Sequence, residues 1–168
     1  GLEALMQKNR ERVRATTNLR AAIYDTDITF VAVGTPSNAD GSIDLTYVFR
    51  VCEEIGEVLR EKKDFHIVII KSTVFPGTTD DRVRHILEYI SGKKAGVDFG
   101  LGSNPEFLRE GNAVQDFLSP DRVVIGADDL RTADALKALY TSIASKVLVT
   151  SSRTAEMIKY ASNAILAT

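Results

Sequence analysis

Continuous apolar runs alternate along the chain with segments in which apolar residues recur at helical spacing. Runs rich in β-branched residues are typical of strands buried on both faces of a parallel sheet. They predict strands at residues 28–33, 66–70, 99–103, 122–126 and 146–149. Apolar positions at i, i+3, i+4 and i+7 are typical of amphipathic helices. They predict helices near residues 2–13, 48–59, 78–90 and 129–144, and another that begins near residue 152.

The order of these elements predicts the fold class. Strands that alternate with helices at this spacing indicate an α/β fold with a mostly parallel, doubly wound sheet. A boundary is expected near residues 150–152, where the last helix leaves the sheet. Residues 1–150 are therefore assigned to the sheet domain and residues 151–168 to the start of the next element.

Three consecutive strands are expected to end in polar, turn-forming sequences, namely Gly34-Thr35-Pro36-Ser37, Ser72-Thr73 and Ser103-Asn104-Pro105-Glu106. Open α/β sheets bind ligands outside the carboxyl ends of their strands. The hydroxyls of Thr35 and Thr73 and the carboxylate of Glu106 or Glu110 are thus candidates for one crevice. The alternative is that these residues are ordinary loop formers and helix caps.

The last predicted helix carries a second candidate pair. Lys159 and Asn163 are i, i+4 neighbours on one helical face. Together they can hold an oxyanion or a sugar hydroxyl by charge and hydrogen bonding. From the pattern alone, a solvated lysine on the outer face of the helix is the favoured alternative.

Composition narrows the range of partners. A net charge of −2 gives no electrostatic reason to expect nucleic acid or an anionic membrane. The single cysteine, Cys52, excludes an internal disulfide and fits a reducing, cytoplasmic compartment. No apolar run approaches the roughly 20 residues of a membrane-spanning helix. His66 and His85 have no His or Cys nearby at ligand spacing, so no metal site is expected.

Several motifs carry a family resemblance. The stretches "VAVGTPSNADGSIDLTYV", "KSTVFPGTT", "SGKKAGVDFGLGSNPEFLREGNAVQDFLSPDRVVIG" and "AEMIKYASNA" resemble the nucleotide-sugar dehydrogenase family, which includes UDP-glucose and GDP-mannose dehydrogenases. The motifs occur in the family's order and cover nearly the whole chain. "SGKKAGVDFG" and "AEMIKY" look most similar to the GDP-mannose 6-dehydrogenases. The resemblance implies a Rossmann-like NAD-binding domain followed by the start of a central helix.

The resemblance also implies an activity. Such enzymes use NAD to oxidise the C6 hydroxyl of a nucleotide-activated hexose to a carboxylate in two hydride transfers, a step of polysaccharide biosynthesis. The aldehyde stays bound in the usual scheme as a cysteine thiohemiacetal. A homodimer or higher oligomer formed through the central helix is the implied assembly.

By position, the resemblance assigns roles to individual residues. Thr35 would contact NAD, and Thr73 would lie beside the nicotinamide and help order a catalytic water. Glu110 would meet the substrate near the reacting hexose, and Glu106 is the second carboxylate for water or proton handling. Lys159 and Asn163 would stabilise the oxyanion at C6. The backbone of residues 107–109 would border the sugar nucleotide.

The chain also departs from the family pattern. No Gly-x-Gly-x-x-Gly follows a strand, so the first glycine-rich βα unit is expected to precede Gly1. The nucleophilic cysteine is expected beyond Thr168. Cys52 lies in an apolar helical stripe and is predicted to be a small core residue. The chain is therefore interpreted as an internal fragment that is inactive by itself.

Two other functional classes remain open. One is a non-catalytic nucleotide-binding or dimerisation module that uses the same fold. The other is a generic doubly wound domain such as a response-regulator-like receiver, which requires clustered acidic residues after the first strand. Gly34-Thr35-Pro36 does not supply them.

Overall fold

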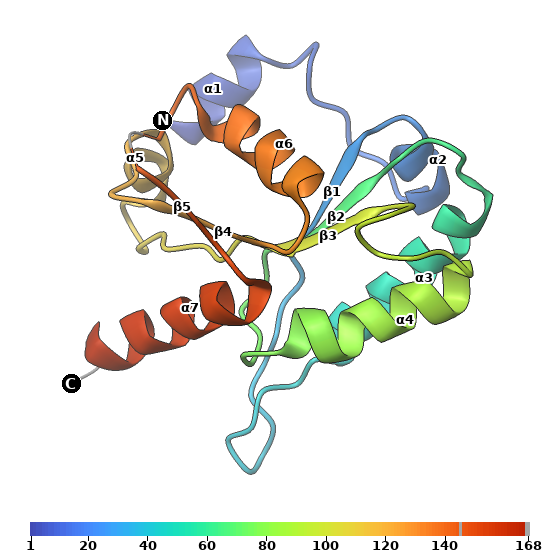
Figure 1. The fold of residues 1–168 in the computed structure, drawn as a ribbon. Helices are drawn as coiled ribbons and strands as arrows, with labels where there is room; N and C mark the ends of the chain where they lie inside the picture. Colours follow the sequence, from blue (N-terminus) through green and yellow to red (C-terminus); the bar gives the residue numbers. More distant parts are fainter. Residues whose placement is uncertain (145, 167–168) are drawn as a thin grey trace.

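A five-stranded sheet forms the centre of the molecule in a computed structural model that describes residues 1–144 and 146–166. The spatial order of the strands follows their order in the sequence, from β1 to β5 (Figure 1). The strands are β1 (Ile28–Val31), β2 (Ile67–Ile70), β3 (Gly100–Ser103), β4 (Val123–Ala127) and β5 (Val147–Thr150). The five predicted strands are thus confirmed, with ends that differ by one or two residues.

Eight helical segments surround the sheet within the described residues. They are α1 (Leu2–Lys8), α2 (Leu19–Tyr24), α3 (Thr46–Glu61), a π-helix (Thr78–Val83), α4 (Arg84–Ser91), α5 (Ala113–Leu118), α6 (Leu130–Tyr140) and α7 (Ser152–Leu166). The sequence pattern missed α2 and α5, which are only six residues each. The expected helix over residues 78–90 begins instead with a π-helical segment. The first helix ends at Lys8 rather than near Val13.

Strand direction reverses once in the sheet. β1, β2 and β3 are parallel, β3 and β4 are antiparallel, and β4 and β5 are parallel to each other. The prediction of a mostly parallel sheet is confirmed, but the hydrophobic pattern gave no sign of the reversal. Because β4 runs backwards, its amino end lies on the side of the sheet where the first three strands have their carboxyl ends.

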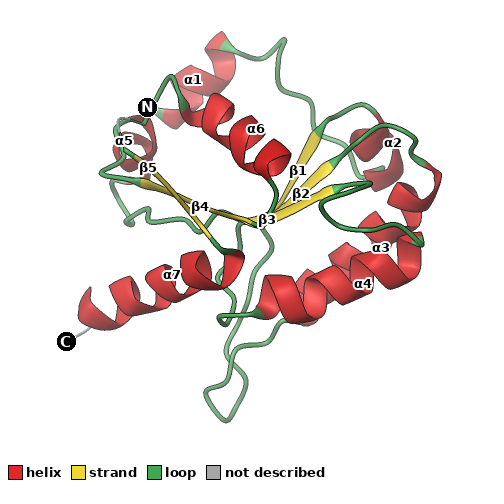
Figure 2. Ribbon diagram, in the orientation of Figure 1, coloured by secondary structure: helices red, strands yellow, loops and turns green. Residues whose placement is uncertain are grey.

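Helices cover both faces of the sheet, as expected for a doubly wound fold (Figure 2). Alternate residues of β2 point to opposite faces. Val68 and Ile70 belong to a core shared with α3 and α4, whereas Ile69 belongs to a core shared with α6. Cys52 lies in the first core with no exposed surface, and burial raises the pKa of its thiol to about 12. Its predicted role as a small core residue is confirmed.

The last helix begins where the sequence predicts. α7 starts at Ser152, immediately after the β5 strand, although residues 167–168 of the expected final segment lie outside the described residues. Within residues 1–144 and 146–166, no helix has the length and apolar character needed to cross a membrane. The same residues contain no group of three or more His, Cys, Asp or Glu side chains arranged to hold a metal ion.

Candidate active site at the carboxyl ends of strands β1 to β3

The carboxyl ends of β1, β2 and β3 lie side by side, because these strands are parallel neighbours. Backbone and side-chain hydrogen bonds join the first two exits. Ser72 donates its backbone N–H to the carbonyl of Val31 at 3.0 Å and its hydroxyl to the carbonyl of Val33 at 2.6 Å. The prediction that the exits share one edge of the sheet is confirmed for these three strands.

Asn104, the first residue after β3, is a buried hub of hydrogen bonds. Its side-chain oxygen accepts from Lys71 Nζ at 3.1 Å and from the hydroxyl of Tyr140 at 2.5 Å. Its amide nitrogen donates to the carbonyl of Val124 in β4 at 2.7 Å. Buried polar atoms are costly unless they are paired, and here one amide pairs groups from the β2 exit, β4 and α6. Asn104 thus fixes the start of the loop that carries Glu106.

Lys159 and Glu106 come together from distant parts of the sequence. Lys159 Nζ lies 3.5 Å from Glu106 Oε2, and the Lys159 residue is only 8% exposed. The ammonium also lies 5.4 Å from the centre of the Phe107 ring, within range of a cation–π contact. The solvated-lysine alternative is therefore wrong: Lys159 faces inward, toward the loop after β3.

Lys71 is a second amino group at the same place. Burial lowers the pKa of Lys71 to about 8, the negative charge of Glu106 opposes that shift, and the positive charge of Lys159 adds to it. Two ammonium groups and one carboxylate thus face a single region. Such an arrangement presents excess positive charge to any ligand oxygen that acquires negative charge.

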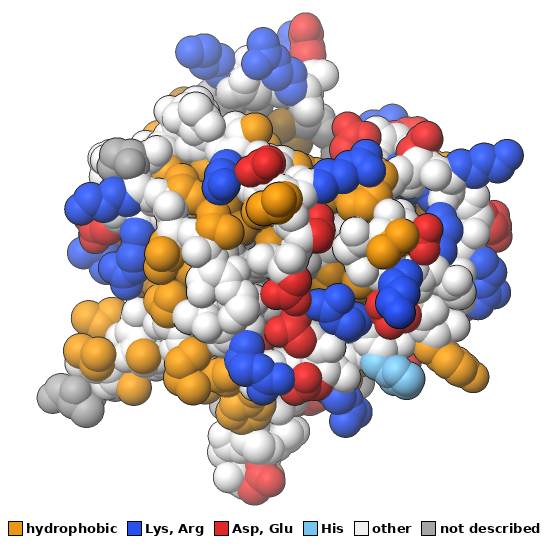
Figure 3. Space-filling view, viewed as in Figure 1, with side chains coloured by type: hydrophobic (Ala, Val, Ile, Leu, Met, Phe, Trp, Pro, Cys, Tyr) orange, Lys and Arg blue, Asp and Glu red, His pale blue; other side chains and the backbone are white. Residues whose placement is uncertain are grey.

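A cavity of about 610 Å³ extends from this region along α7 toward α5. Its lining includes Lys71, Asn104, Lys159 and Asn163. Cavities of this size are typical of small-molecule and cofactor sites. Figure 3 shows that acidic and basic side chains are interspersed over the face viewed there, with hydrophobic side chains gathered along α7.

Arg122 and Phe107 form one wall of the cavity. The Arg122 guanidinium carbon lies 4.9 Å from the centre of the Phe107 ring, and the guanidinium donates to the hydroxyl of Ser162 at 3.2 Å. Asp121 and Arg122, which precede β4, both line the cavity. Arg122 reaches the site because β4 runs backwards and brings its amino end there.

Asp116 holds the loop after β3 against α5. Its carboxylate accepts hydrogen bonds from the backbone and guanidinium of Arg109 and from the side chain of Asn112. The bonds from Arg109 are the main reason that the pKa of Asp116 lies well below its usual range. The loop that contains Glu106 and Glu110 is thus fixed at Asn104 on one side and at Asp116 on the other.

The remaining predicted residues lie farther from this centre. Glu110 is exposed and does not line the cavity, whereas Asn163 lines the cavity with its side chain exposed. Thr35 and Thr73 are half-buried at the first two exits and lie outside the cavity lining. Within the described residues, the hydroxyls of Thr35 and Thr73 form no hydrogen bond with the protein, so both are free to bind a ligand.

Sequence reasoning missed three residues of the site. They are Lys71, which follows β2, Asn104, which belongs to the predicted third exit, and Tyr140, which lies inside the helix predicted at residues 129–144. A lysine that follows a fully buried strand directly was the one available signal. The roles of Asn104 and Tyr140 depend on contacts across 36 residues, which no local pattern records.

Comparison with known proteins identifies the chain. A family described as the UDP-glucose/GDP-mannose dehydrogenase family, NAD binding domain, matches residues 1–144. The chain belongs to this family. The observed Rossmann-like sheet and the predicted NAD cofactor agree with that membership.

Two curated relatives of the UDP-glucose/GDP-mannose dehydrogenase family illustrate the similarity. GDP-mannose 6-dehydrogenase of Pseudomonas aeruginosa is 47% identical over 165 residues, which are 97% of this chain and 38% of that protein. UDP-glucose 6-dehydrogenase of Haloferax volcanii is 45% identical over 173 residues, covering 99% of this chain and 40% of the relative. The chain thus spans about two fifths of the length of these relatives.

Solved structures of family members have the same fold. A ternary complex of GDP-mannose dehydrogenase from Pseudomonas aeruginosa gives a TM-score of 0.97 at 46% identity, over 99% of this chain and 39% of that one. A UDP-glucose dehydrogenase from Pyrobaculum islandicum gives 0.90 at 45% identity, over 98% of this chain and 38% of the other.

Proposed function

We propose that this chain supplies the cofactor side and part of the substrate side of an NAD-dependent nucleotide-sugar 6-dehydrogenase. The proposed reaction oxidises the C6 hydroxyl of GDP-mannose to the carboxylate of GDP-mannuronate. The observation that carries this proposal is the nearly buried Lys159, which lies 3.5 Å from Glu106 beside the strand exits of a family NAD-binding domain.

NAD supplies the hydride acceptor when it is bound, and the chain's own residues handle charge and protons. Loss of hydride from an alcohol requires removal of the hydroxyl proton and stabilisation of the negative oxygen. We assign the Lys159 ammonium, which lines the cavity, to stabilise that oxygen. Asn163, one turn further along α7, is assigned to donate a hydrogen bond to the same substrate region.

Hydrolysis of the thioester left by the second hydride transfer requires an oriented water, and the candidates for positioning it are Glu106, Glu110 and Thr73. A carboxylate accepts a proton from water and a hydroxyl orients it. Glu106 is held close to Lys159, whereas the exposed Glu110 is free to approach a bound sugar. Thr35 and Thr73 are assigned to NAD because their hydroxyls are unpaired at the first two exits.

GDP-mannose is the preferred substrate because relatives at 46–47% identity include a GDP-mannose 6-dehydrogenase and a solved GDP-mannose dehydrogenase. UDP-glucose is the alternative, supported by relatives at 45% identity.

We further propose that residues 1–150 are part of the NAD-binding domain and that residues 151–168 are the start of the central helix. Because the chain spans about two fifths of its relatives, it is proposed to be inactive alone.

The test is NADH production by the full-length protein, with GDP-mannose and UDP-glucose assayed in parallel. About two NADH per GDP-mannose, with little from UDP-glucose, is the expected result for two successive hydride transfers. More NADH from UDP-glucose than from GDP-mannose would support the same two-step oxidation with UDP-glucose as the substrate. Absence of turnover with both sugars would contradict the proposal, and NADH production by residues 1–168 alone would contradict the inactive fragment.

A non-catalytic assembly module is the second candidate. Met157, Ile165 and Leu166 are exposed on α7 by 54%, 74% and 83%. Exposed apolar residues gathered on one helix favour a protein contact, and we propose that α7 contributes to a homodimer or higher oligomer. Sedimentation of Met157→Glu beside wild type tests this contact.

The single cysteine supports a reducing, cytoplasmic location.

A further inference from the structure

Glu156, one helical turn before Lys159, is buried and bound to a different strand exit. The residue is 2% exposed, and its carboxylate accepts from the backbone N–H of Gly77 at 2.5 Å and of Thr79 at 2.9 Å. Gly77 immediately precedes the π-helix that follows the β2 exit, and Thr79 is the second residue of that helix. Thr73 lies only four residues before Gly77.

No basic side chain explains why this carboxylate is buried. Among the described residues, no lysine, arginine or histidine forms an ion pair with Glu156. Burial raises the pKa of Glu156, and the bonds from Thr79 and Gly77 only partly offset that rise. A buried carboxylate paired only with backbone donors is costly, so its retention calls for a benefit other than stability.

The turn bound by Glu156 does not have ordinary helical geometry. Gly77 has a φ of +96°, and a Cβ there would lie 2.6 Å from a guanidinium nitrogen of Arg153. The following six residues form a π-helix, and such segments are rare and frequently lie at functional sites. The Glu156 carboxylate accepts from two backbone N–H groups at the start of this segment, and these bonds specify its geometry.

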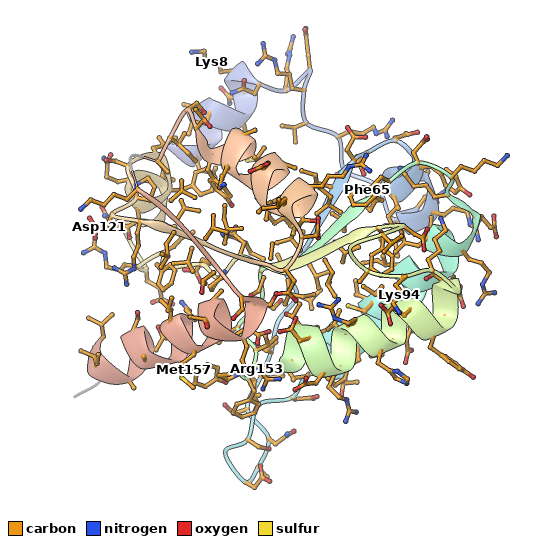
Figure 4. All side chains as sticks on the ribbon, viewed as in Figure 1. Lys8, Phe65, Lys94, Asp121, Arg153 and Met157 are labelled. Atoms are coloured by element: carbon orange, nitrogen blue, oxygen red, sulfur yellow. The ribbon has the colours of Figure 1, made fainter. Side chains whose placement is uncertain are left out.

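α7 contacts the same segment at three successive points of one helical face. A guanidinium nitrogen of Arg153 lies 2.8 Å from a carboxylate oxygen of Asp81, and Glu156 binds the backbone of Gly77. The ring of Tyr160 stacks on that of Phe75, with the two ring centres 5.4 Å apart. Figure 4 labels Arg153 at the beginning of α7, beside the segment that leads into α4. The neighbouring face of α7 presents Lys159 to the loop after β3. One helix thus connects the β2 and β3 exits.

We propose that Glu156 is a positioning residue that sets the β2 exit, and therefore Thr73, relative to Lys159 on the same helix. The inference rests on the proposed function and adds that the cofactor side and the substrate side are aligned through one buried carboxylate. A displacement of about 1 Å at a reacting centre can reduce the rate on the order of 100-fold.

The test compares Glu156→Gln with Arg153→Met in the full-length enzyme. Glutamine keeps the shape but presents an NH₂ group to one of two N–H donors, so the turn must move. We expect kcat per folded enzyme to fall about tenfold or more, with a higher KM for NAD and a sugar-nucleotide KM within about twofold. Arg153→Met removes the exposed contact with the same segment and is expected to change each constant less than about twofold.

A second readout is independent of turnover. Hydrogen exchange of the peptide that contains Gly77 and Thr79 is expected to accelerate at least tenfold in Glu156→Gln and to stay near wild type in Arg153→Met. If wild type shows no turnover, the proposed function fails while this readout still tests the contact. If Glu156→Gln does not fold, Glu156→Asp replaces it, because aspartate is too short to reach both amides. We expect kcat, the KM for NAD and the exchange rate to change in the same directions but by less.

Two results would overturn the inference. In the first, Glu156→Gln lowers only the melting temperature or the yield, with kcat per folded enzyme and both KM values unchanged. In the second, exchange at residues 77–79 does not change. Either result would assign Glu156 a purely structural role.

Discussion

The inner and outer ends of the cavity differ in how their polar side chains are held. At the inner end, the side chains of Lys71, Asn104 and Lys159 are buried or half-buried. Asn104 accepts hydrogen bonds from Lys71 and Tyr140, and Lys159 forms an ion pair with Glu106. Toward solvent, Asn163 at the cavity and Glu110 outside its lining are exposed, and within the described part of the chain neither side chain forms a hydrogen bond or ion pair. The inner groups are therefore held by the protein itself, whereas the outer side chains are not.

This difference has energetic consequences. Preorganised groups stabilise developing charge without further reorganisation, but their burial makes them costly to alter. Exposed groups cost little to replace and contribute mainly when a substrate covers them. Substitutions at the two ends should therefore separate effects on stability from effects on substrate binding.

The largest expected effect is on turnover when Lys159 is replaced. Lys159→Met keeps most of the side-chain volume and removes the charge, so we expect kcat to fall about 100- to 1000-fold, as for loss of an oxyanion donor. Steady-state kinetics of the full-length enzyme measure it. Lys137→Met, on the exposed face of α6, is the matched control and should retain wild-type rates.

Asn104→Ala should give the largest loss of stability. It leaves the Val124 carbonyl and the Tyr140 hydroxyl without their buried partner, and we expect the free energy of unfolding to drop by about 3 kcal/mol. Urea denaturation measures the change, with Asn163→Ala as the control at the outer end. The control should change stability by less than about 0.5 kcal/mol. Equal losses for the two asparagines would contradict the comparison.

Lys71 should make stability depend on pH above neutrality. Its pKa is about 8 in the folded protein and near 10.5 when unfolded. Between these values the unfolded chain holds the proton and the folded chain has released it, so stability rises with pH. Relative to Lys71→Met, wild type should gain about 2 kcal/mol from pH 8 to 10.5. Urea titrations of both proteins across this range test the sign, and a flat difference would argue against a buried amine.

Tyr140→Phe is the mildest test of the inner network. The substitution removes one hydrogen bond to Asn104, which keeps its bond from Lys71, so about 1 kcal/mol of stability should be lost. Thermal unfolding at fixed pH measures it. A loss in Tyr140→Phe as large as that in Asn104→Ala would mean that the tyrosine, rather than the amide, organises the network.

Hydrophobic spacing predicted the parts of the fold that depend on local patterns. The five strands and the long helices α3, α6 and α7 follow directly from apolar periodicity. The short helix α5 and the π-helical segment do not, because tertiary contacts hold them rather than an amphipathic stripe. Asp116, for example, connects the loop after β3 to α5 through Arg109.

The site was predicted only in part, for the same physical reason. Lys159 and Glu106 were both candidates, but their spacing of 53 positions gave no reason to expect an ion pair between them. The reversal of β4 was not visible either, because antiparallel and parallel buried strands have similar apolar runs. That reversal brings Arg122 to the cavity, a position that its place before a buried strand did not indicate.

Two glycines at the reversal determine how closely α7 can approach the sheet. A Cβ on Gly126 would lie 2.6 Å from the Cα of Ser152, and one on Gly102 would lie 2.5 Å from the carbonyl oxygen of Gly126. β3, β4 and the start of α7 thus approach one another closely because neither glycine carries a side chain. A larger residue at either glycine would have to push these backbones apart. The helix that carries Glu156 and Lys159 is therefore held in register by the backbone itself, and its alignment should survive sequence drift throughout the surrounding core.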